Sequence, residues 1–291
     1  MGPRPARRPD GAAVDRLTNP ALARLHPTGE HPERQARLLE LAGETVERRA
    51  SDEQLGRVHT AELLAFLRTI DAPLLFDTDT IASETSWEAA TLAAGIALEA
   101  VDRGGFALVR PPGHHALADR AMGFCLLNNI AVAARYAQAE LGLPRVAIID
   151  FDVHHGNGTE AIFRGDDSVF FVSLHQWPFY PGTGGPGTSD ATTLNVQLAA
   201  GTGDAEYLAT FADRVVPAVE SFGPDLVLVS AGFDAHEADP LGGLDLTDAA
   251  FSELAGACAR LAPRCAAVLE GGYNLSTLPR LVDVAHRGFG G

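Results

Sequence analysis

Short runs of apolar residues alternate with longer helix-like patterns over most of the chain. The apolar runs predict strands at residues 106–109, 146–149, 169–174, 226–229 and 266–269. Residues 130–141, 207–222 and 248–261 have the spacing of apolar positions that is typical of helices. Strands that are apolar throughout and separated by helices indicate a mainly parallel sheet with helices on both faces. The predicted fold class is therefore α/β.

Two further helices are expected nearer the N-terminus. Proline is acceptable in the first turn of a helix, so Pro32 can begin one that extends to about residue 49, with apolar residues along one face. A second helix is expected from near Ser86 to about residue 101, because Thr85 and Glu88 have the spacing of a capping box.

The chain is expected to consist of a flexible tail followed by one domain. Residues 1–16 are rich in arginine, proline and glycine and lack apolar periodicity, which is typical of a mobile segment. Residues 17–291 contain no internal repeat and no long linker, so we expect a single domain there.

Composition and charge exclude several functions. The 291 residues are 46% hydrophobic and 21% charged, as in soluble globular proteins. The net charge of -16 would repel a phosphate backbone, so we expect no direct nucleic-acid partner and favour cationic or neutral ones. All 22 basic residues are arginine, which excludes a P-loop lysine and a Schiff-base lysine.

Cysteine usage and hydropathy bear on the compartment. Cys125, Cys258 and Cys265 are too few for a disulfide scaffold and have no C-x-x-C spacing, which favours a reducing compartment. No apolar stretch approaches the roughly 18 residues of a membrane span, so we expect a cytoplasmic protein without a membrane partner.

Chemically active residues follow each predicted strand. In chain order they are His114 and His115; Asp150, Asp152, His154 and Asn157; His175; Asp234 and His236; and Glu270 and Tyr273. Because the carboxyl ends of parallel strands form one edge of a sheet, we expect these side chains to converge there.

Asp152 and His154 form the first candidate metal-binding pair. Residues two apart in an extended segment project to the same side, and Asp234, after another strand, is the natural third ligand. Taken alone, an Asp-x-His pair is more often a helix cap beside an exposed histidine. Two carboxylates and one histidine with an open position describe a catalytic metal site rather than a structural one.

A metal neutralised by two carboxylates polarises its bound water weakly, so a separate base is needed. His114 and His115 can supply it, with Asp150 and Asn157 available as their partners, although two exposed loop histidines remain the alternative. The Tyr273 hydroxyl could stabilise an oxyanion, or the ring could pack on the next helix.

Together these motifs resemble the histone deacetylase superfamily, in particular class II-like bacterial histone deacetylases and acetylpolyamine amidohydrolases. The motifs that carry the resemblance are His31-Pro-Glu-Arg, Arg110-Pro-Pro-Gly-His-His, Gly123-Phe-Cys-Leu-Leu-Asn-Asn, Asp150-Phe-Asp-Val-His-His-Gly-Asn-Gly-Thr, Ser173-Leu-His, Pro181-Gly-Thr-Gly, Gly232-Phe-Asp-Ala-His, Asp239-Pro-Leu-Gly and Gly271-Gly-Tyr-Asn. They occur in order over nearly the whole chain.

The resemblance implies an arginase-like fold and a deacetylase mechanism. It implies zinc, or alternatively iron, held by Asp152, His154 and Asp234. His115 would act as general base and then acid, and His114, oriented by Asp150, would support the transition state. Tyr273 would polarise the acyl carbonyl. Asn157 stands where class I members have aspartate, and asparagine at this position resembles class II members.

The resemblance also implies the remaining sites. The substrate channel would use Gly123, Phe124, Tyr180 and Leu241, and Asp79 would be the loop aspartate that grips the substrate. A structural potassium ion would be bound by Asp150, Asp152, His154, Ser173 and Leu174. The family's first strand is expected to be mostly missing.

The expected activity is removal of acetyl or other short acyl groups from lysine side chains of proteins or peptides. An acetylated polyamine is the alternative substrate, although Leu241 stands where the polyamine-selective relative has glutamate. A non-catalytic acyl-group binder is a further alternative. A binuclear ureohydrolase is disfavoured, because Gly156 and His236 occupy positions where that class has aspartates.

Overall fold

A computed structural model describes residues 14–290, which fold around one eight-stranded sheet. The strand order is β2-β1-β5-β10-β9-β6-β7-β8, and every neighbouring pair is parallel. The strands of this sheet are β1 (Arg16–Thr18), β2 (Glu44–Thr45), β5 (Phe106–Ala107), β6 (Val146–Asp150), β7 (Val169–Gln176), β8 (Thr193–Leu198), β9 (Leu226–Ala231) and β10 (Cys265–Leu269). The α/β prediction is confirmed.

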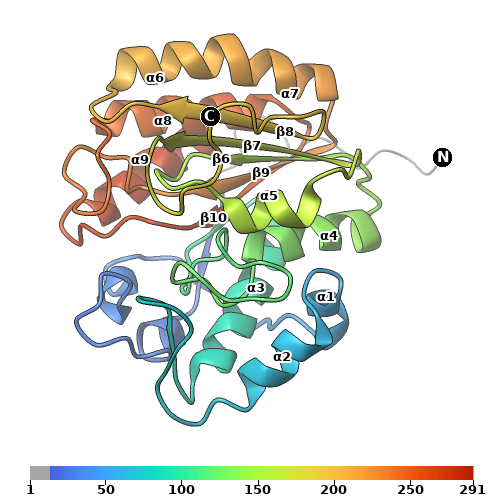
Figure 1. Ribbon diagram of the computed structural model, residues 1–291, viewed down its shortest axis with the longest axis vertical. Coiled ribbons are helices and arrows are strands. Elements are labelled where there is room, and N and C mark those ends of the chain that lie inside the picture. Colours follow the sequence, from blue (N-terminus) through green and yellow to red (C-terminus); the bar gives the residue numbers. More distant parts are fainter. Residues whose placement is uncertain (1–13, 291) are drawn as a thin grey trace.

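Helices cover the sheet on both faces. They are α1 (Asp52–Gly56), α2 (Ala61–Arg68), α3 (Ser86–Arg103), α4 (Asn129–Leu141), α5 (Asn157–Phe163), α6 (Asp204–Thr210), α7 (Val216–Phe222), α8 (Asp248–Arg260) and α9 (Leu278–Gly290). α3, α4 and α5 contact the strands from one side, and α8, with α9 packed on it, from the other. Figure 1 shows α6 and α7 at the top and α1 and α2 at the bottom. None of the helices within residues 14–290 could cross a membrane.

The central strands are buried because both of their faces are covered. Every residue of β6, β7 and β9 is buried, which explains why their sequences are nearly continuous apolar runs rather than alternating ones. The five predicted strands are therefore confirmed, with small changes at their ends. Parallel strands deliver their C-terminal loops to one edge, which is where the polar motifs lie.

The helix predicted from Pro32 to about residue 49 is wrong. This segment contains a 3-10 helix, Gln35–Leu38, and then β2. Leu39 is 69% exposed instead of lying on an apolar face. Arg37, in contrast, is fully buried and donates hydrogen bonds to backbone carbonyls near the C-terminus. These hydrogen bonds satisfy buried donors of the guanidinium, so tertiary contacts rather than the local apolar pattern determine the conformation of this segment.

Other N-terminal predictions are partly corrected. α3 begins at Ser86 as expected, but the capping box is absent, because the Thr85 hydroxyl accepts a hydrogen bond from the His26 N–H instead. Of the predicted tail, residues 1–13 lie outside the described residues, and Arg16 already begins β1. Within the described residues, β1 has three residues and pairs with both β2 and β5, so strands are present at the sheet edge that the sequence analysis had left in doubt.

Arginine–carboxylate ion pairs connect surface segments across the fold. Arg48, after β2, lies 2.6 Å from Asp102 on α3, and Arg103, at the end of α3, lies 2.8 Å from Glu44 of β2. Arg164 bridges α5 to the loop before β8 through Asp190. Such exposed pairs each contribute little to stability, on the order of 0–1 kcal/mol, but they orient neighbouring segments.

We predict that the buried histidine His59 makes the stability of the fold depend on pH. Burial lowers the pKa of His59 to about 4, and its Nε2 accepts a hydrogen bond from the Asn128 N–H. The unfolded chain binds this proton near pH 6.5 and the folded chain does not, so stability should fall as the pH drops below 6.5. Between pH 7 and pH 5 this histidine should account for a loss of about 2 kcal/mol.

The variant His59→Gln isolates that contribution, because glutamine can retain the hydrogen bonds but does not titrate. Denaturant unfolding at pH 7 and pH 5 should show a smaller pH-induced loss for the variant than for the parent. Equal losses in the two proteins would contradict the assignment.

Candidate active site and metal centre

The site is built from loops at the carboxyl edge of the sheet. β6 and β9 are direct neighbours, and Asp150, the last residue of β6, is in register with Ser230 of β9. The loops that leave these two strands therefore start side by side. They bring Asp152 and His154 from one strand close to Asp234 from the other.

The candidate metal ligands converge on one point. His154 Nδ1 lies 3.1 Å from Asp152 Oδ1 and 3.1 Å from Asp234 Oδ2. One ligand atom from each of the three residues lies within 4.8 Å of the others. The structure thus brings together the three residues that the sequence analysis selected as ligands.

Backbone groups orient both carboxylates. Asp152 Oδ2 accepts a hydrogen bond from the Gly271 N–H at 2.8 Å, and Asp234 Oδ1 accepts one from the Val153 N–H at 3.0 Å. The opposite oxygen of each carboxylate faces His154. A Cβ at Gly271 would lie 2.0 Å from Asp234 Oδ2, so only glycine allows this close approach.

The donor set fits a single divalent ion such as zinc. Asp152 and Asp234 are both fully buried, and burial together with the neighbouring Asp152 carboxylate raises the pKa of Asp234 to about 7. A bound cation would offset the repulsion between these two carboxylates. Three nitrogen and oxygen ligands are also the number that catalytic zinc sites use when one position stays open.

Two adjacent histidines lie beside the ligands but have different partners. His114 Nδ1 lies 2.9 Å from Asp150 Oδ2, whereas His115 Nδ1 lies 2.7 Å from the amide oxygen of Asn157. The Asn157 amide nitrogen in turn donates to Met122 Sδ at 3.4 Å. Because Asn157 presents an oxygen, His115 Nδ1 carries the hydrogen and Nε2 is left as the acceptor.

The two rings are therefore in opposite charge environments. Burial would lower the pKa of His114, but the Asp150 and Asp152 carboxylates raise it well above its usual value. Burial and the nearby His114 lower the pKa of His115 well below its usual value. The arrangement pairs a cationic imidazole with a neutral one that can accept a proton.

Tyr273 approaches the same site from the loop after β10. Its backbone N–H donates to Asp239 Oδ2 at 2.6 Å, and its ring makes an edge contact with Phe124, with centroids 5.6 Å apart. The guanidinium of Arg37 lies 4.8 Å from the centre of the ring. Burial raises the pKa of the phenol well above its usual value, so it remains a hydrogen-bond donor.

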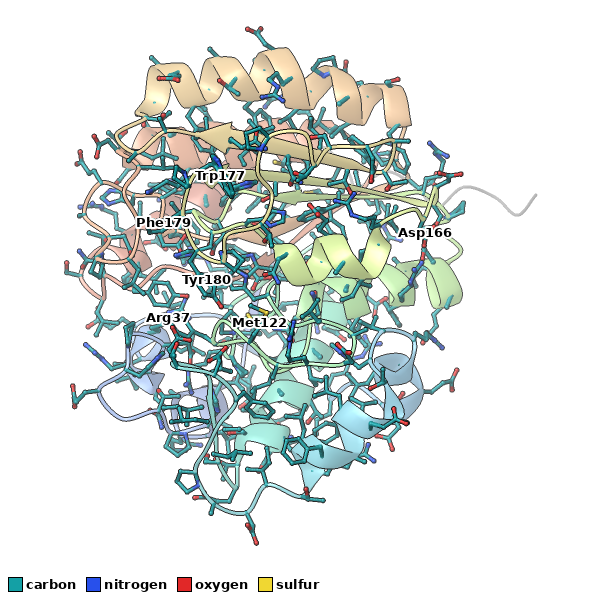
Figure 2. The ribbon with its side chains drawn as sticks, viewed as in Figure 1. Arg37, Met122, Asp166, Trp177, Phe179 and Tyr180 are labelled. Atoms are coloured by element: carbon teal, nitrogen blue, oxygen red, sulfur yellow. The ribbon has the colours of Figure 1, made fainter. Side chains whose placement is uncertain are left out.

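A cavity of about 220 Å³ leads to these groups. All four residues predicted for the substrate channel line it, namely Gly123, Phe124, Tyr180 and Leu241. Asp79 and Phe179 are also in the wall, although the resemblance did not single out Phe179. In Figure 2, Phe179, Tyr180, Met122 and Arg37 lie along the junction between the sheet and the N-terminal segments.

Several other polar residues of the motifs have structural partners instead. His175 bonds Ser173 Oγ and the Gly184 carbonyl, and His236 lies 3.2 Å from Asp248. Cys125 is fully buried, and burial raises the pKa of its thiol, as expected for an inert cysteine.

The fold and the site define a class: a parallel α/β protein with a candidate mononuclear metal site beside a histidine pair and a tyrosine. The sequence model of the histone deacetylase domain matches residues 21–289. The chain belongs to the histone deacetylase family, as the motifs had indicated.

Known proteins show how far the similarity extends. Histone deacetylase 10, chloroplastic, of Oryza sativa subsp. japonica is 42% identical over 299 residues, covering 92% of this chain and 66% of the relative. Polyamine deacetylase HDAC10 of Mus musculus is 41% identical over 266 residues, covering 80% and 39%. The crystal structure of the HDA15 HD domain is 37% identical with a TM-score of 0.90, covering 96% of this chain and 89% of that chain.

The chain spans only part of the full length of these curated relatives. It covers 66%, 54% and 50% of three similar plant histone deacetylases. The match to the family's sequence model, residues 21–289, includes the candidate metal ligands, the histidine pair and Tyr273.

We predict that the protein binds one zinc ion per chain. Asp234→Asn should weaken zinc binding by about 100-fold or more, because asparagine has nearly the same size and shape as aspartate but lacks the negative charge of the ligand. Metal analysis after dialysis against a graded chelator would measure this. The matched control is Asp213→Asn, which changes an exposed carboxyl elsewhere. An Asp234→Asn protein that retains zinc as tightly as the control would contradict the ligand assignment.

Proposed function

We propose that the chain is a metal-dependent amide hydrolase that removes acetyl or other short acyl groups from lysine side chains of proteins or peptides. The observation that carries the proposal is the convergence of Asp152, His154 and Asp234 on one point. His154 also lines a cavity whose wall includes His115 and Tyr273. The histone deacetylases and probable deacetylases among the relatives support the reaction class.

The proposed metal is zinc, with iron as the alternative, held by Asp152, His154 and Asp234. When bound, it would supply Lewis acidity to a water molecule and to the acyl carbonyl. The hydrogen bond from His115 Nδ1 to Asn157 leaves Nε2 free to take a proton from that water. His114, paired with Asp150, would stabilise the developing negative charge.

The rest of the reaction is addition to the carbonyl, cleavage of the amide bond and protonation of the leaving nitrogen. Water adds to the acyl carbon, the amide C–N bond breaks, and the proton held on His115 Nε2 passes to the leaving nitrogen. The products are a carboxylic acid and a free amine. The Tyr273 hydroxyl donates a hydrogen bond to the carbonyl oxygen as that oxygen becomes negative.

The cavity wall suits the stem of an acylated lysine. Phe124, Phe179 and Leu241 offer apolar surface to its methylene groups, and Tyr180, 38% exposed, stands where the cavity meets solvent. An acylated lysine is neutral, so it loses little on entering an apolar channel.

A structural potassium ion completes the proposal. Asp150 and Ser173 are neighbours in register across β6 and β7, and Asp152, His154 and Leu174 lie within a few residues of them. Oxygen donors from these five residues would bind the ion and so support the loop that carries the metal ligands.

We predict that Tyr273→Phe lowers kcat by about 100-fold or more with unchanged zinc content, because the variant loses only the hydroxyl donor. Steady-state hydrolysis of an acetyl-lysine peptide measures it. Tyr136→Phe serves as the control, since that hydroxyl bonds Asp102 far from the cavity. Tyr273→Phe at parental kcat would remove the phenol from the mechanism.

An acetylated polyamine is the second candidate substrate. The net charge of -16 attracts a polycation, Asp79 lines the cavity, and a polyamine deacetylase is among the relatives. Leu241 lines the same cavity with an apolar side chain, which offers no charge to a second ammonium group. This residue favours the acyl-lysine peptide.

We predict that kcat/KM is at least about tenfold higher for an acetyl-lysine peptide than for N-acetylputrescine, and that Leu241→Glu shifts this ratio toward the polyamine by attracting its ammonium group. Parallel assays with both substrates on metal-analysed protein test it. Leu241→Gln, of the same size without the charge, is the matched control. A parent protein that prefers N-acetylputrescine would establish the polyamine as the substrate class.

A further inference from the structure

Glu270 is a fully buried carboxylate that the proposed mechanism does not use. It follows β10 directly and precedes Gly271, Gly272 and Tyr273. Its main chain therefore belongs to the loop that carries the phenol. Its side chain turns instead toward the loop that carries the two histidines.

The Glu270 carboxylate is bonded to the backbone of the histidine loop. Oε2 accepts hydrogen bonds from the Gly113 N–H at 2.6 Å and from the His114 N–H at 3.2 Å, and Oε1 accepts one from Ser230 Oγ at 3.2 Å. Burial raises the pKa of Glu270 to about 7, and its carboxyl oxygens can accept hydrogen bonds from N–H groups in either protonation state. If the Glu270 side chain were removed, the interior N–H groups of Gly113 and His114 would lose the acceptor that they share.

The same residue is also held on its main-chain side. Arg37 Nη2 donates to the Glu270 carbonyl at 2.5 Å, and Arg37 Nε donates to the Gly272 carbonyl at 2.8 Å. The histidine loop is closely packed at this point, because a Cβ at Gly113 would lie 2.5 Å from the Asn129 nitrogen. Glu270 thus joins two loops that are both closely packed.

We propose that Glu270 is a positioning residue that fixes His114 and His115 relative to Tyr273. It touches none of the reacting atoms and acts through the backbone of Gly113 and His114. Misplacing a reacting group by about 1 Å can lower a rate by about 100-fold, so the link is expected to matter for turnover. This inference rests on the proposed hydrolase function.

Two substitutions separate geometry from charge. In Glu270→Gln the side-chain oxygen can still accept from the Gly113 and His114 N–H groups, while its amide nitrogen faces Ser230. In Glu270→Ala that acceptor is gone. We expect kcat to fall by about 100-fold in Glu270→Ala with KM and zinc content near those of the parent, and by less than about tenfold in Glu270→Gln.

Two further variants test for a merely structural effect. Ser230→Ala removes only the bond to Oε1 and is expected to cost less than Glu270→Ala. Leu254→Ala, which opens a cavity at a buried position on α8, lowers the melting temperature without touching either loop. It should retain the parental kcat even where its melting temperature falls as far as that of Glu270→Ala.

Hydrogen exchange gives a readout that needs no substrate. The amides of Gly113 and His114 should exchange faster in Glu270→Ala, and near the parental rate in Glu270→Gln. Unchanged exchange in Glu270→Ala would overturn the proposal. So would a Glu270→Gln protein as impaired as Glu270→Ala, or an equal loss of kcat in Leu254→Ala. A parent protein that hydrolyses no acyl amide would refute the proposed function but not this link.

Discussion

The burial of two carboxylates side by side is the constraint around which this protein is organised. Asp152 and Asp234 have lost nearly all contact with water, and each repels the other's charge. Backbone N–H groups satisfy one oxygen of each, and glycine at position 271 lets a third loop close over them. A divalent cation is the natural complement to what is left, two converging oxygens and an imidazole nitrogen.

The parallel sheet makes this concentration of charge possible by keeping it local. The loops that carry the metal ligands, the histidine pair and Tyr273 all leave the same edge of the sheet, so their polar groups can bond one another while the strands behind them stay apolar. Two neighbouring histidines at this edge have different hydrogen-bond partners. Carboxylates raise the pKa of His114, whereas burial and the nearby His114 lower the pKa of His115, whose hydrogen-bond partner is an amide. These different surroundings give two adjacent histidines distinct protonation states.

Sequence patterns predicted what depends on local chemistry. The central strands and the residues that follow them could be found because strands covered on both faces are apolar throughout. β8 could not, because it is an edge strand whose buried face carries Asn195, which bonds Glu160. The roles of Arg37 and Glu270 could not be predicted either, because the partners of these side chains are backbone groups more than a hundred positions away along the chain. Nearly every residue has a backbone carbonyl and an N–H, so the sequence does not show which of these groups a distant side chain will bond. Such contacts can be identified only in the folded structure.

The ion pairs described above that connect α3 and α5 to neighbouring segments use guanidinium groups, and the sequence contains no lysine. A guanidinium is not acylated under the conditions that acylate an amine, so the network that orients these segments keeps its charge when acyl donors accumulate. These 291 residues therefore offer no side-chain amine to the modification that the proposed substrates carry, and none of them can compete as an acylated-lysine substrate.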